Sequence, residues 1–220
     1  MPFRTLLLDT DDVLYIHPRP DRHLQDYLAA YDLQPRHPKV VQKALKAAHF
    51  DVLHGRIARQ EYYDAILSFH GLPQQALEYG RSVLLADAAA IQPIGGAVET
   101  LIELNNNGLE IGIAANTEHP AEDLVIWLED VGFPRDLWWM VMTSCEIGLT
   151  KPDPAFFKAT LQITDIAPEE ILYVGRDFYE LAMIGEQGIM PLAFQPDNPE
   201  NIGGSNIIHS YDELYQLVLG

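Results

Sequence analysis

The chain has 220 residues, of which 32 are acidic and 14 are lysine or arginine, so its formal net charge is −18. A charge of this sign repels a polyphosphate backbone, and nucleic acid is therefore not expected as a partner. The one cysteine, Cys145, excludes an intramolecular disulfide. Because the sequence shows no charged-then-apolar leader and no long uncharged apolar span, we expect a soluble, cytoplasmic protein that does not bind membranes.

Short apolar runs alternate with amphipathic helical stretches, which is typical of a parallel sheet covered by helices on both faces. The chain is long enough to pack as one domain, or as one domain that carries an insertion. A helix is predicted over 97–106 and a surface loop over 195–205. The predicted strands are residues 5–9, 111–115, 139–143, 171–174 and 190–194.

The segment 15–90 breaks this alternation, because it offers four helical patterns in succession and no convincing strand. The loops between the four patterns are short, which favours a helical bundle. We therefore predict an α/β core formed by 1–14 and 91–220, with an inserted all-helical domain at 15–90. The Pro and Gly content indicates hinges near 15–20 and 87–96. The four predicted helices are 22–31, 39–53, 59–69 and 74–88.

Two carboxylates follow the first predicted strand. Alternate side chains of a strand share a face, so Asp9 and Asp11 are expected to point toward the same space while Thr10 points away. One carboxylate can attack phosphorus and a second can protonate the leaving oxygen, provided that a cation offsets their repulsion. An acidic turn without a catalytic role is the alternative for this motif taken alone.

Three later segments add to this motif. They are the apolar strand at 111–115 followed by Asn116-Thr117, the run Lys-Pro-Asp-Pro at 151–154, and the apolar strand at 171–174 followed by Gly-Arg-Asp. Together with the first motif they resemble the four motifs of the haloacid dehalogenase-like superfamily, whose members are mostly phosphatases. The resemblance spans nearly the whole chain. It implies a Rossmann-like core with a helical cap, inserted after the first motif, that closes over the active site and selects the substrate.

The resemblance also implies a role for each matching residue. Asp9 corresponds to the nucleophile, Asp11 to the general acid and then base, and Lys151 to the cation that holds Asp9 ionised and neutralises phosphate charge. Asp12 stands where the family usually has glycine, and aspartate is among the residues that adopt a left-handed backbone at modest cost.

Ala115 departs from the family pattern, because the family residue at this position donates a hydroxyl to the phosphoryl group. Alanine has no donor in its side chain. We expect the backbone amide of Asn116 or the hydroxyl of Thr117 to contact the phosphate in its place, together with Lys151. Losing one such donor typically slows an enzyme by roughly 10² to 10³.

Arg176 is the second departure, because the family has a magnesium-binding acid there, and arginine cannot ligate a metal. In one interpretation its guanidinium bridges Asp9 and Asp11 where the ion would sit. In the other, a one-residue shift brings Asp177 to a magnesium site with Asp9 and Asp11, and Glu180 acts as the second acid.

Two main functions follow from these residues. The first is a phosphatase of a small phosphorylated metabolite, which forms an aspartyl-phosphate at Asp9 and has a weakened or altered dependence on magnesium. The second is a catalytically degenerate relative that binds a small anion or a protein partner. A true haloacid dehalogenase is a third option, because that reaction needs an aspartate but no metal, although the retained Asp11 argues against it.

Overall fold

The centre of the fold is a six-stranded parallel sheet. The structure is a computed structural model, and it describes residues 3–163, 165–196, 199–201 and 206–220. The first strand, β1 (Thr5–Leu8), is buried at every position, as expected for a parallel strand with helices on both faces. In sheet order the strands are β5 (Trp138–Thr143), β4 (Glu110–Ala115), β1, β6 (Ile171–Gly175), β7 (Met190–Phe194) and β8 (Ile207–Ile208).

The predicted α/β class and all five predicted strands are confirmed. Strand β8 was missed because two residues are too few to show an alternating pattern. The predicted loop at 195–205 falls partly on 197–198 and 202–205, which lie outside the described residues, and Pro199–Asn201 forms a 3₁₀ turn.

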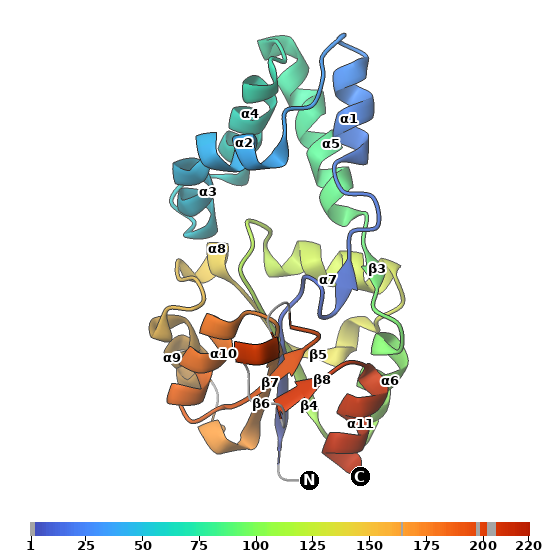
Figure 1. The fold of residues 1–220 in the computed structure, drawn as a ribbon, viewed down its shortest axis with the longest axis vertical. Coiled ribbons are helices and arrows are strands. Elements are labelled where there is room, and N and C mark those ends of the chain that lie inside the picture. The colour runs from blue at the N-terminus through green and yellow to red at the C-terminus, as the bar shows by residue number, and fades with distance from the viewer. Residues whose placement is uncertain (1–2, 164, 197–198, 202–205) are drawn as a thin grey trace.

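Helices cover both faces of the sheet (Figure 1). Leu6 and Leu8 pack in one hydrophobic cluster, whereas Leu7, between them, packs in a second cluster on the opposite face. The first cluster receives α6, α7 and α11, and the second receives α9 and α10. The core helices are α6 (Ala97–Asn106), α7 (Ala121–Asp130), α8 (Ser144–Ile147), α9 (Pro154–Ile163), α10 (Phe178–Glu186) and α11 (Tyr211–Leu219).

A separate layer of helices stands above the carboxyl ends of the strands (Figure 1). It has its own hydrophobic cluster, built around Leu24, Leu28, Tyr63 and Leu67. The predicted helix at 39–53 is wrong as a single element, because the chain breaks at Leu45 into two helices. The helices of this layer are α1 (Arg22–Ala29), α2 (Pro38–Ala44), α3 (Lys46–Leu53), α4 (Arg59–His70) and α5 (Leu77–Ala89).

Two neighbouring chain segments connect the helical layer to the core. Strand β2 (Tyr15–Ile16) pairs antiparallel with β3 (Gln92–Pro93), so the outgoing and returning segments run side by side. This ribbon lies within the hinge regions expected from the sequence, and the boundaries at 15 and 90 stay a prediction. Within the residues that the structure describes, no helix combines the length and the apolar character needed to cross a bilayer.

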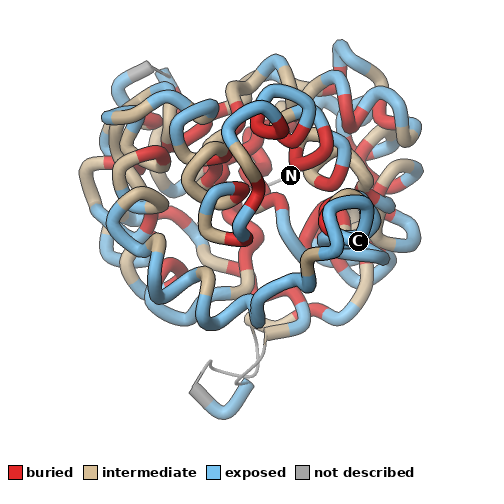
Figure 2. The backbone as a smooth tube through the Cα atoms, turned by 90° about the horizontal axis from the view of Figure 1, so that it is seen from above, coloured by how far each residue is buried: buried red, intermediate tan, exposed pale blue. Residues whose placement is uncertain are grey.

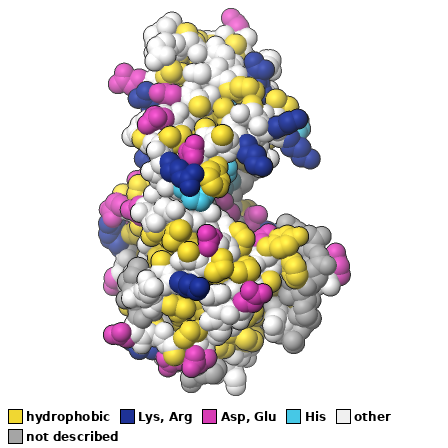
Figure 3. Space-filling view, turned by 90° about the vertical axis from the view of Figure 1, so that its left-hand side faces the viewer, with side chains coloured by type: hydrophobic (Ala, Val, Ile, Leu, Met, Phe, Trp, Pro, Cys, Tyr) yellow, Lys and Arg dark blue, Asp and Glu magenta, His cyan; other side chains and the backbone are white. Residues whose placement is uncertain are grey.

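The helical layer also touches the core at a second place, far from the ribbon. Arg59 at the start of α4 forms an ion pair with Asp123 of α7, and its guanidinium lies 2.9 Å from Nδ1 of His119. Gly55 approaches the core so closely that a Cβ atom there would overlap the carbonyl oxygen of Cys145. Figure 3 shows the narrow waist between the two parts, with basic and histidine side chains beside it. Seen from above in Figure 2, the outer turns of the backbone are mostly exposed and the buried stretches lie further in.

Candidate active site

Asp9 lies directly after β1, at the edge of the sheet that faces the helical layer. Its backbone N–H donates to the carbonyl of Val174 on β6 at 2.9 Å, which extends the strand pairing by one residue. The chain then turns, because the N–H groups of Val13 and Leu14 both donate to the carbonyl of Thr10. Asp12 has a φ of 57°, so it adopts the left-handed backbone that we expected at the usual glycine position.

Lys151 brings the first and third motifs together. Its Nζ lies 2.7 Å from Oδ1 of Asp9, and its side chain is 1% exposed. Burial alone would lower the pKa of Lys151, but the neighbouring carboxylates of Asp9 and Glu180 outweigh it and raise that pKa. The lysine is therefore charged and stabilises the Asp9 carboxylate.

Glu180 and Tyr173 complete the surroundings of this ammonium group. Lys151 Nζ lies 3.1 Å from Oε2 of Glu180 and donates to the Tyr173 hydroxyl at 3.0 Å, which donates in turn to Glu180 at 3.1 Å. Burial raises the pKa of Glu180, and the charge of Lys151 opposes this rise. Sequence reasoning missed Tyr173. Its signal was a tyrosine hydroxyl in a strand expected to be buried on both faces, where that hydroxyl needs a partner.

Asn116 positions the loop that carries Lys151. Its side-chain amide donates to the carbonyl of Lys151 at 2.8 Å, and its side-chain oxygen accepts from the N–H of Lys151 at 2.8 Å. The side chain of Asn116 is thus committed to the third motif. The expected contact between the backbone amide of Asn116 and a phosphate stays a prediction.

Thr117 is buried beside Asn116. Its hydroxyl oxygen accepts from the N–H of His119 at 3.1 Å, which leaves the hydroxyl proton available to donate. Ser144 holds the backbone of Thr117 on both sides, accepting from its N–H and donating to its carbonyl. Ala115 is fully buried in the hydrophobic cluster of the core. Thr117 therefore has a hydroxyl proton that it could donate, and its contact with phosphate stays a prediction.

Asp11 differs from Asp9 in its surroundings. Its side chain is 72% exposed, and Nε2 of His17 lies 3.9 Å from its Oδ1. Partial desolvation of the carboxyl nevertheless raises the pKa of Asp11. The charges of Asp9 and Asp12 act in the same direction, whereas His17 opposes them. The raised pKa suits Asp11 to holding and donating a proton.

Arg176 does not make the contact that its position suggested. We expected an ion pair with Asp9 or Asp11, but Nη1 of Arg176 lies 3.1 Å from Oδ2 of Asp12. No ion pair joins Arg176 to Asp9 or Asp11 among the residues described. The prediction was wrong because it followed the family pattern, in which glycine at the Asp12 position offers no carboxylate.

Asp177 has a structural role at the same loop. Its side chain caps α10 by accepting from the N–H of Glu180 at 2.9 Å, and the residue is exposed. Over the described part of the chain, no three histidine, cysteine, aspartate or glutamate residues lie together in a way that could hold a metal ion. An arginine, Arg176, stands where the family has its acid. The donor set therefore does not fit the family's magnesium site, and Asp9, Asp11 and Asp177 as ligands stay a prediction without support from this geometry.

A family model described as haloacid dehalogenase-like hydrolase matches residues 3–186. The chain belongs to this family. Haloacid dehalogenase-like hydrolase domain-containing protein 3 of Bos taurus is 30% identical over 109 residues, which cover 50% of this chain and 41% of the relative. The Homo sapiens protein of the same name is 28% identical over 137 residues, covering 59% and 53%. The chain spans about half the length of these curated relatives.

Solved structures with the same fold include enzymes of different chemistry. A 2-haloacid dehalogenase from Pseudomonas syringae pv. Tomato DC3000 has a TM-score of 0.71 at 19% identity, covering 98% of both chains. A predicted phosphoglycolate phosphatase from Haemophilus somnus has a TM-score of 0.68 at 15% identity, covering 99% and 98%. A HAD family enzyme from Bacteroides thetaiotaomicron, solved as a magnesium complex, has a TM-score of 0.68 at 17% identity, covering 88% and 93%. These likenesses establish the fold, and magnesium accompanies some members of the family.

Proposed function

We propose that this protein is a phosphatase that cleaves a small phosphorylated metabolite through an aspartyl-phosphate on Asp9. The observation that carries the proposal is the contrast between two neighbouring carboxyls. Asp9 lies against the buried charge of Lys151 and is suited to attack as an anion. Asp11 has a raised pKa and is suited to give up a proton.

The contacts of Asp9 favour one of its two oxygens as the nucleophile. Oδ1 accepts from both the N–H of Thr10 and Nζ of Lys151, so attack is assigned to Oδ2. As the bond from Oδ2 to phosphorus forms, the bond from phosphorus to the alcohol oxygen breaks, and Asp11 gives its proton to that oxygen. Asp11, now a carboxylate, takes a proton from water, whose oxygen displaces Asp9 from phosphorus and restores both side chains.

Positive charge near the phosphoryl group comes from the chain itself in this proposal. Lys151 offsets the charge of the transferring group, as preorganised cations do in phosphoryl transfer. Arg176 adds a second fixed charge, although its pair with Asp12 reduces its strength. We therefore expect hydrolysis that depends only weakly on magnesium.

The proposal is tested by measuring phosphate release from a panel of small phosphomonoesters, with magnesium and with a chelator. We expect slow release that the chelator reduces less than about tenfold and that Asp9→Asn abolishes. Acid quenching followed by borohydride reduction would convert an acyl phosphate at Asp9 to homoserine, which mass spectrometry detects. Equal phosphate release by the native protein and by Asp9→Asn would remove the proposed mechanism.

The second candidate is a degenerate relative that binds a small anion without turnover. The missing hydroxyl at Ala115 and the pairing of Arg176 with Asp12 are the observations that favour it. Saturable binding of inorganic phosphate without release from any ester of the panel would support this candidate. Release of halide from a 2-haloacid in the same assay would instead support dehalogenase chemistry.

A further inference from the structure

A cavity lies between the helical layer and the core, beside His17. This neck cavity has a volume of about 260 Å³, and His17, which lies 3.9 Å from Asp11, forms part of its wall. Tyr62 and Tyr63 of α4 line it from the helical layer, and Glu118 lines it from the core. A substrate whose phosphate meets Asp9 would extend its alcohol portion past His17 into this space.

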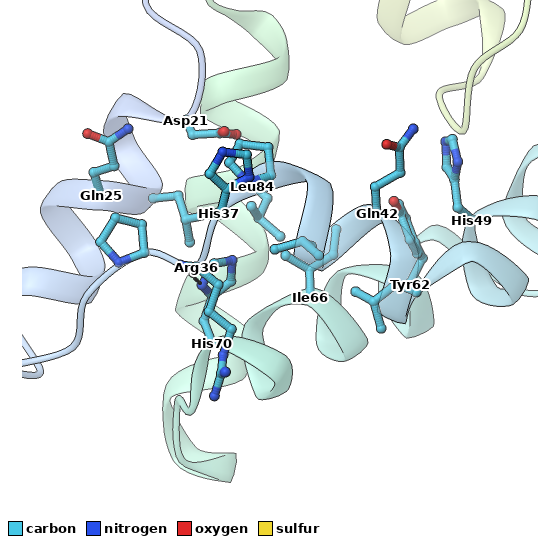
Figure 4. Close-up of a pocket in the computed structure, with 15 residues that line it drawn as sticks. Asp21, Gln25, Arg36, His37, Gln42, His49, Tyr62, Ile66, His70 and Leu84 are labelled. Atoms are coloured by element: carbon cyan, nitrogen blue, oxygen red, sulfur yellow. Dashed lines mark hydrogen bonds between the residues drawn. The ribbon is translucent and has the colours of Figure 1, made fainter.

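A second cavity lies within the helical layer and continues the first. This cap cavity has a volume of about 370 Å³ and is surrounded by α1 to α5 (Figure 4). The two cavities share four wall residues and are therefore adjacent. The shared residues are Asp21, Tyr62, Ile66 and Leu84. The cap cavity is near the lower end of the range typical of small-molecule sites, roughly 300 to 1,000 Å³, and the neck cavity is slightly smaller than that range.

The neck cavity carries negative charge that basic groups offset only in part. The nearest basic group to Glu118 is His119, with Nε2 at 3.7 Å from Oε1, and burial lowers the pKa of His119, which favours its neutral form. Arg59 is held by Asp123 and His119. Asp87 accepts from the ring of His23 at 2.8 Å and from two backbone N–H groups. Among the described residues, Glu118 thus has no hydrogen-bonded partner for its carboxylate, and its nearest basic group is a neutral ring.

Asp21 is another carboxylate of this wall without a hydrogen-bonded partner among the described residues. Burial raises the pKa of Asp21, and the charge of Asp87 raises it further. Glu118 in turn acts on the tyrosines of the same wall, because burial and its charge together raise the pKa of Tyr62 to about 12. A further carboxylate entering the neck would meet the same repulsion.

The wall of the cap cavity combines apolar surface and a neutral histidine ring with the charged side chains of Asp21 and Arg36. Leu24, Ile66 and Leu84 form apolar parts of its wall. His70 accepts from the N–H of Arg36 through Nδ1, and burial followed by the charge of Arg36 lowers its pKa, so it is a neutral ring with one N–H to donate. The Arg36 guanidinium lies 4.8 Å from the centre of the Phe69 ring.

An aromatic pair stands at the junction of the two cavities. The rings of His49 and Tyr62 are stacked, with centroids 5.5 Å apart and an angle of 25° between their planes. Figure 4 shows Tyr62 and His49 on the same side of the cap cavity, with Gln42 beside them. Such a wall suits a flat ring with polar substituents better than a short charged chain.

We propose that the substrate is the phosphomonoester of an uncharged, ring-bearing alcohol or phenol, whose ring passes the neck cavity and enters the cap cavity. This inference rests on the proposed phosphatase function. It separates this protein from the phosphoglycolate phosphatase and the 2-haloacid dehalogenase with the same fold, since the substrates in those names carry a carboxylate.

Binding of two matched, non-hydrolysable ligands tests the inference without relying on turnover. The ligands are 4-(hydroxymethyl)phenylphosphonate and 4-carboxyphenylphosphonate, which have similar size and differ in the charge opposite the phosphonate. Calorimetric titration of the native protein at pH 7 is expected to give a Kd at least about tenfold lower for the hydroxymethyl ligand. Equal affinity, tighter binding of the carboxylate, or no binding of either ligand would overturn the inference.

Two variants locate the preference. Glu118→Gln is expected to reduce the ratio of the two Kd values at least about threefold, because it removes the repelling charge. Ile66→Trp is expected to weaken binding of the hydroxymethyl ligand at least about tenfold by filling the junction, whereas Ile126→Trp, on the exposed face of α7, is the matched control and should bind normally. If the ratio of the two Kd values is the same in Glu118→Gln as in the native protein, the inference is contradicted. This outcome does not depend on whether Ile66→Trp folds.

Failure of this inference and failure of the proposed function give different results. Preferential binding of the hydroxymethyl ligand without hydrolysis of the corresponding phosphate would retain the inference about the site and remove the phosphatase. Acetyl phosphate is too short to reach the cap cavity. Its hydrolysis, together with no preference between the two ligands, would retain the phosphatase and remove the inference about the site.

Discussion

Asn116 and Lys151 hold each other through two hydrogen bonds of 2.8 Å, one from side-chain amide to backbone carbonyl and one from backbone N–H to side-chain oxygen. They are 35 residues apart in the sequence. Asn116 directly follows β4, and Lys151 lies in the loop between α8 and α9. The two hydrogen bonds hold the loop that contains Lys151 against the end of β4. The position of the ammonium group beside Asp9 therefore depends on Asn116.

Asn116→Ala tests this dependence. Two backbone groups of Lys151 lose their partners, so we expect the free energy of unfolding to fall by about 1–3 kcal/mol in urea titrations. Phosphate release should fall at least about tenfold because Lys151 loses its alignment. Asn105→Ala is the matched control, since Asn105 makes one bond of 3.0 Å to the carbonyl of Leu109 far from the site. Equal loss of activity in both variants would contradict a specific role for Asn116.

Lys151→Met should destabilise the protein strongly. It leaves the buried carboxylate of Glu180 without its cation, a change that typically costs about 3–5 kcal/mol. The double variant Lys151→Met/Glu180→Gln removes that charge as well, so we expect it to regain a substantial part of the stability in urea titrations. The double variant should stay inactive, because Asp9 still lacks its cation. A double variant no more stable than Lys151→Met would show that Glu180 is not the source of the loss.

The pH profile of kcat/KM should show a decrease at high pH that reflects the deprotonation of Asp11. This residue can donate a proton only when protonated, and its pKa is raised in the folded protein. In its protonated form His17 lowers that pKa, so His17→Gln is expected to move the decrease to higher pH. The measurement is kcat/KM for an alkyl phosphate, which needs an acid for its leaving group. His209→Gln, at an exposed position, should leave the decrease in place.

The same shift has a consequence for stability. Because the folded-state pKa of Asp11 is raised, its contribution to stability is complete below the unfolded pKa and is lost as the pH rises through the folded pKa. Asp11→Asn should remove this dependence. Thermal unfolding followed between about pH 4 and 7 would detect the difference, and identical pH dependence in the two proteins would contradict the raised pKa.

Arg176→Asp together with Ala115→Ser restores two family residues. The first change supplies a hard oxygen ligand for magnesium and frees Asp12 from its ion pair, and the second supplies a hydroxyl. With magnesium and an aryl phosphate, we expect at least a roughly tenfold gain over the native chain. Adding Asp9→Asn should abolish the gain. Robust magnesium-dependent hydrolysis by the native chain, unaltered in the double variant, would contradict our account of both positions.

The sequence by itself determined the layout of the core. Apolar runs such as Leu6-Leu7-Leu8 are long and clear enough to predict buried parallel strands, because a strand covered on both faces needs apolar side chains at every position. The run Leu6-Leu7-Leu8 placed Asp9 at the end of a strand, and the resemblance of the Lys-Pro-Asp-Pro run to a family motif predicted Lys151 near it; the structure brings the two to 2.7 Å. The break at Leu45 was not predictable, because no glycine or proline marks it in the sequence.

Only the tertiary structure decided the partners of the charged groups. Spacing along the chain could not show that Arg176 meets Asp12, that Asp177 caps a helix, or that Tyr173 joins Lys151. Ion pairs and hydrogen bonds depend on differences of an ångström or two between atoms on separate elements, whereas strand and helix patterns depend on neighbours along one element. The cap and neck cavities have the same origin, because their walls are set by how α4 packs against α1, α5 and the core.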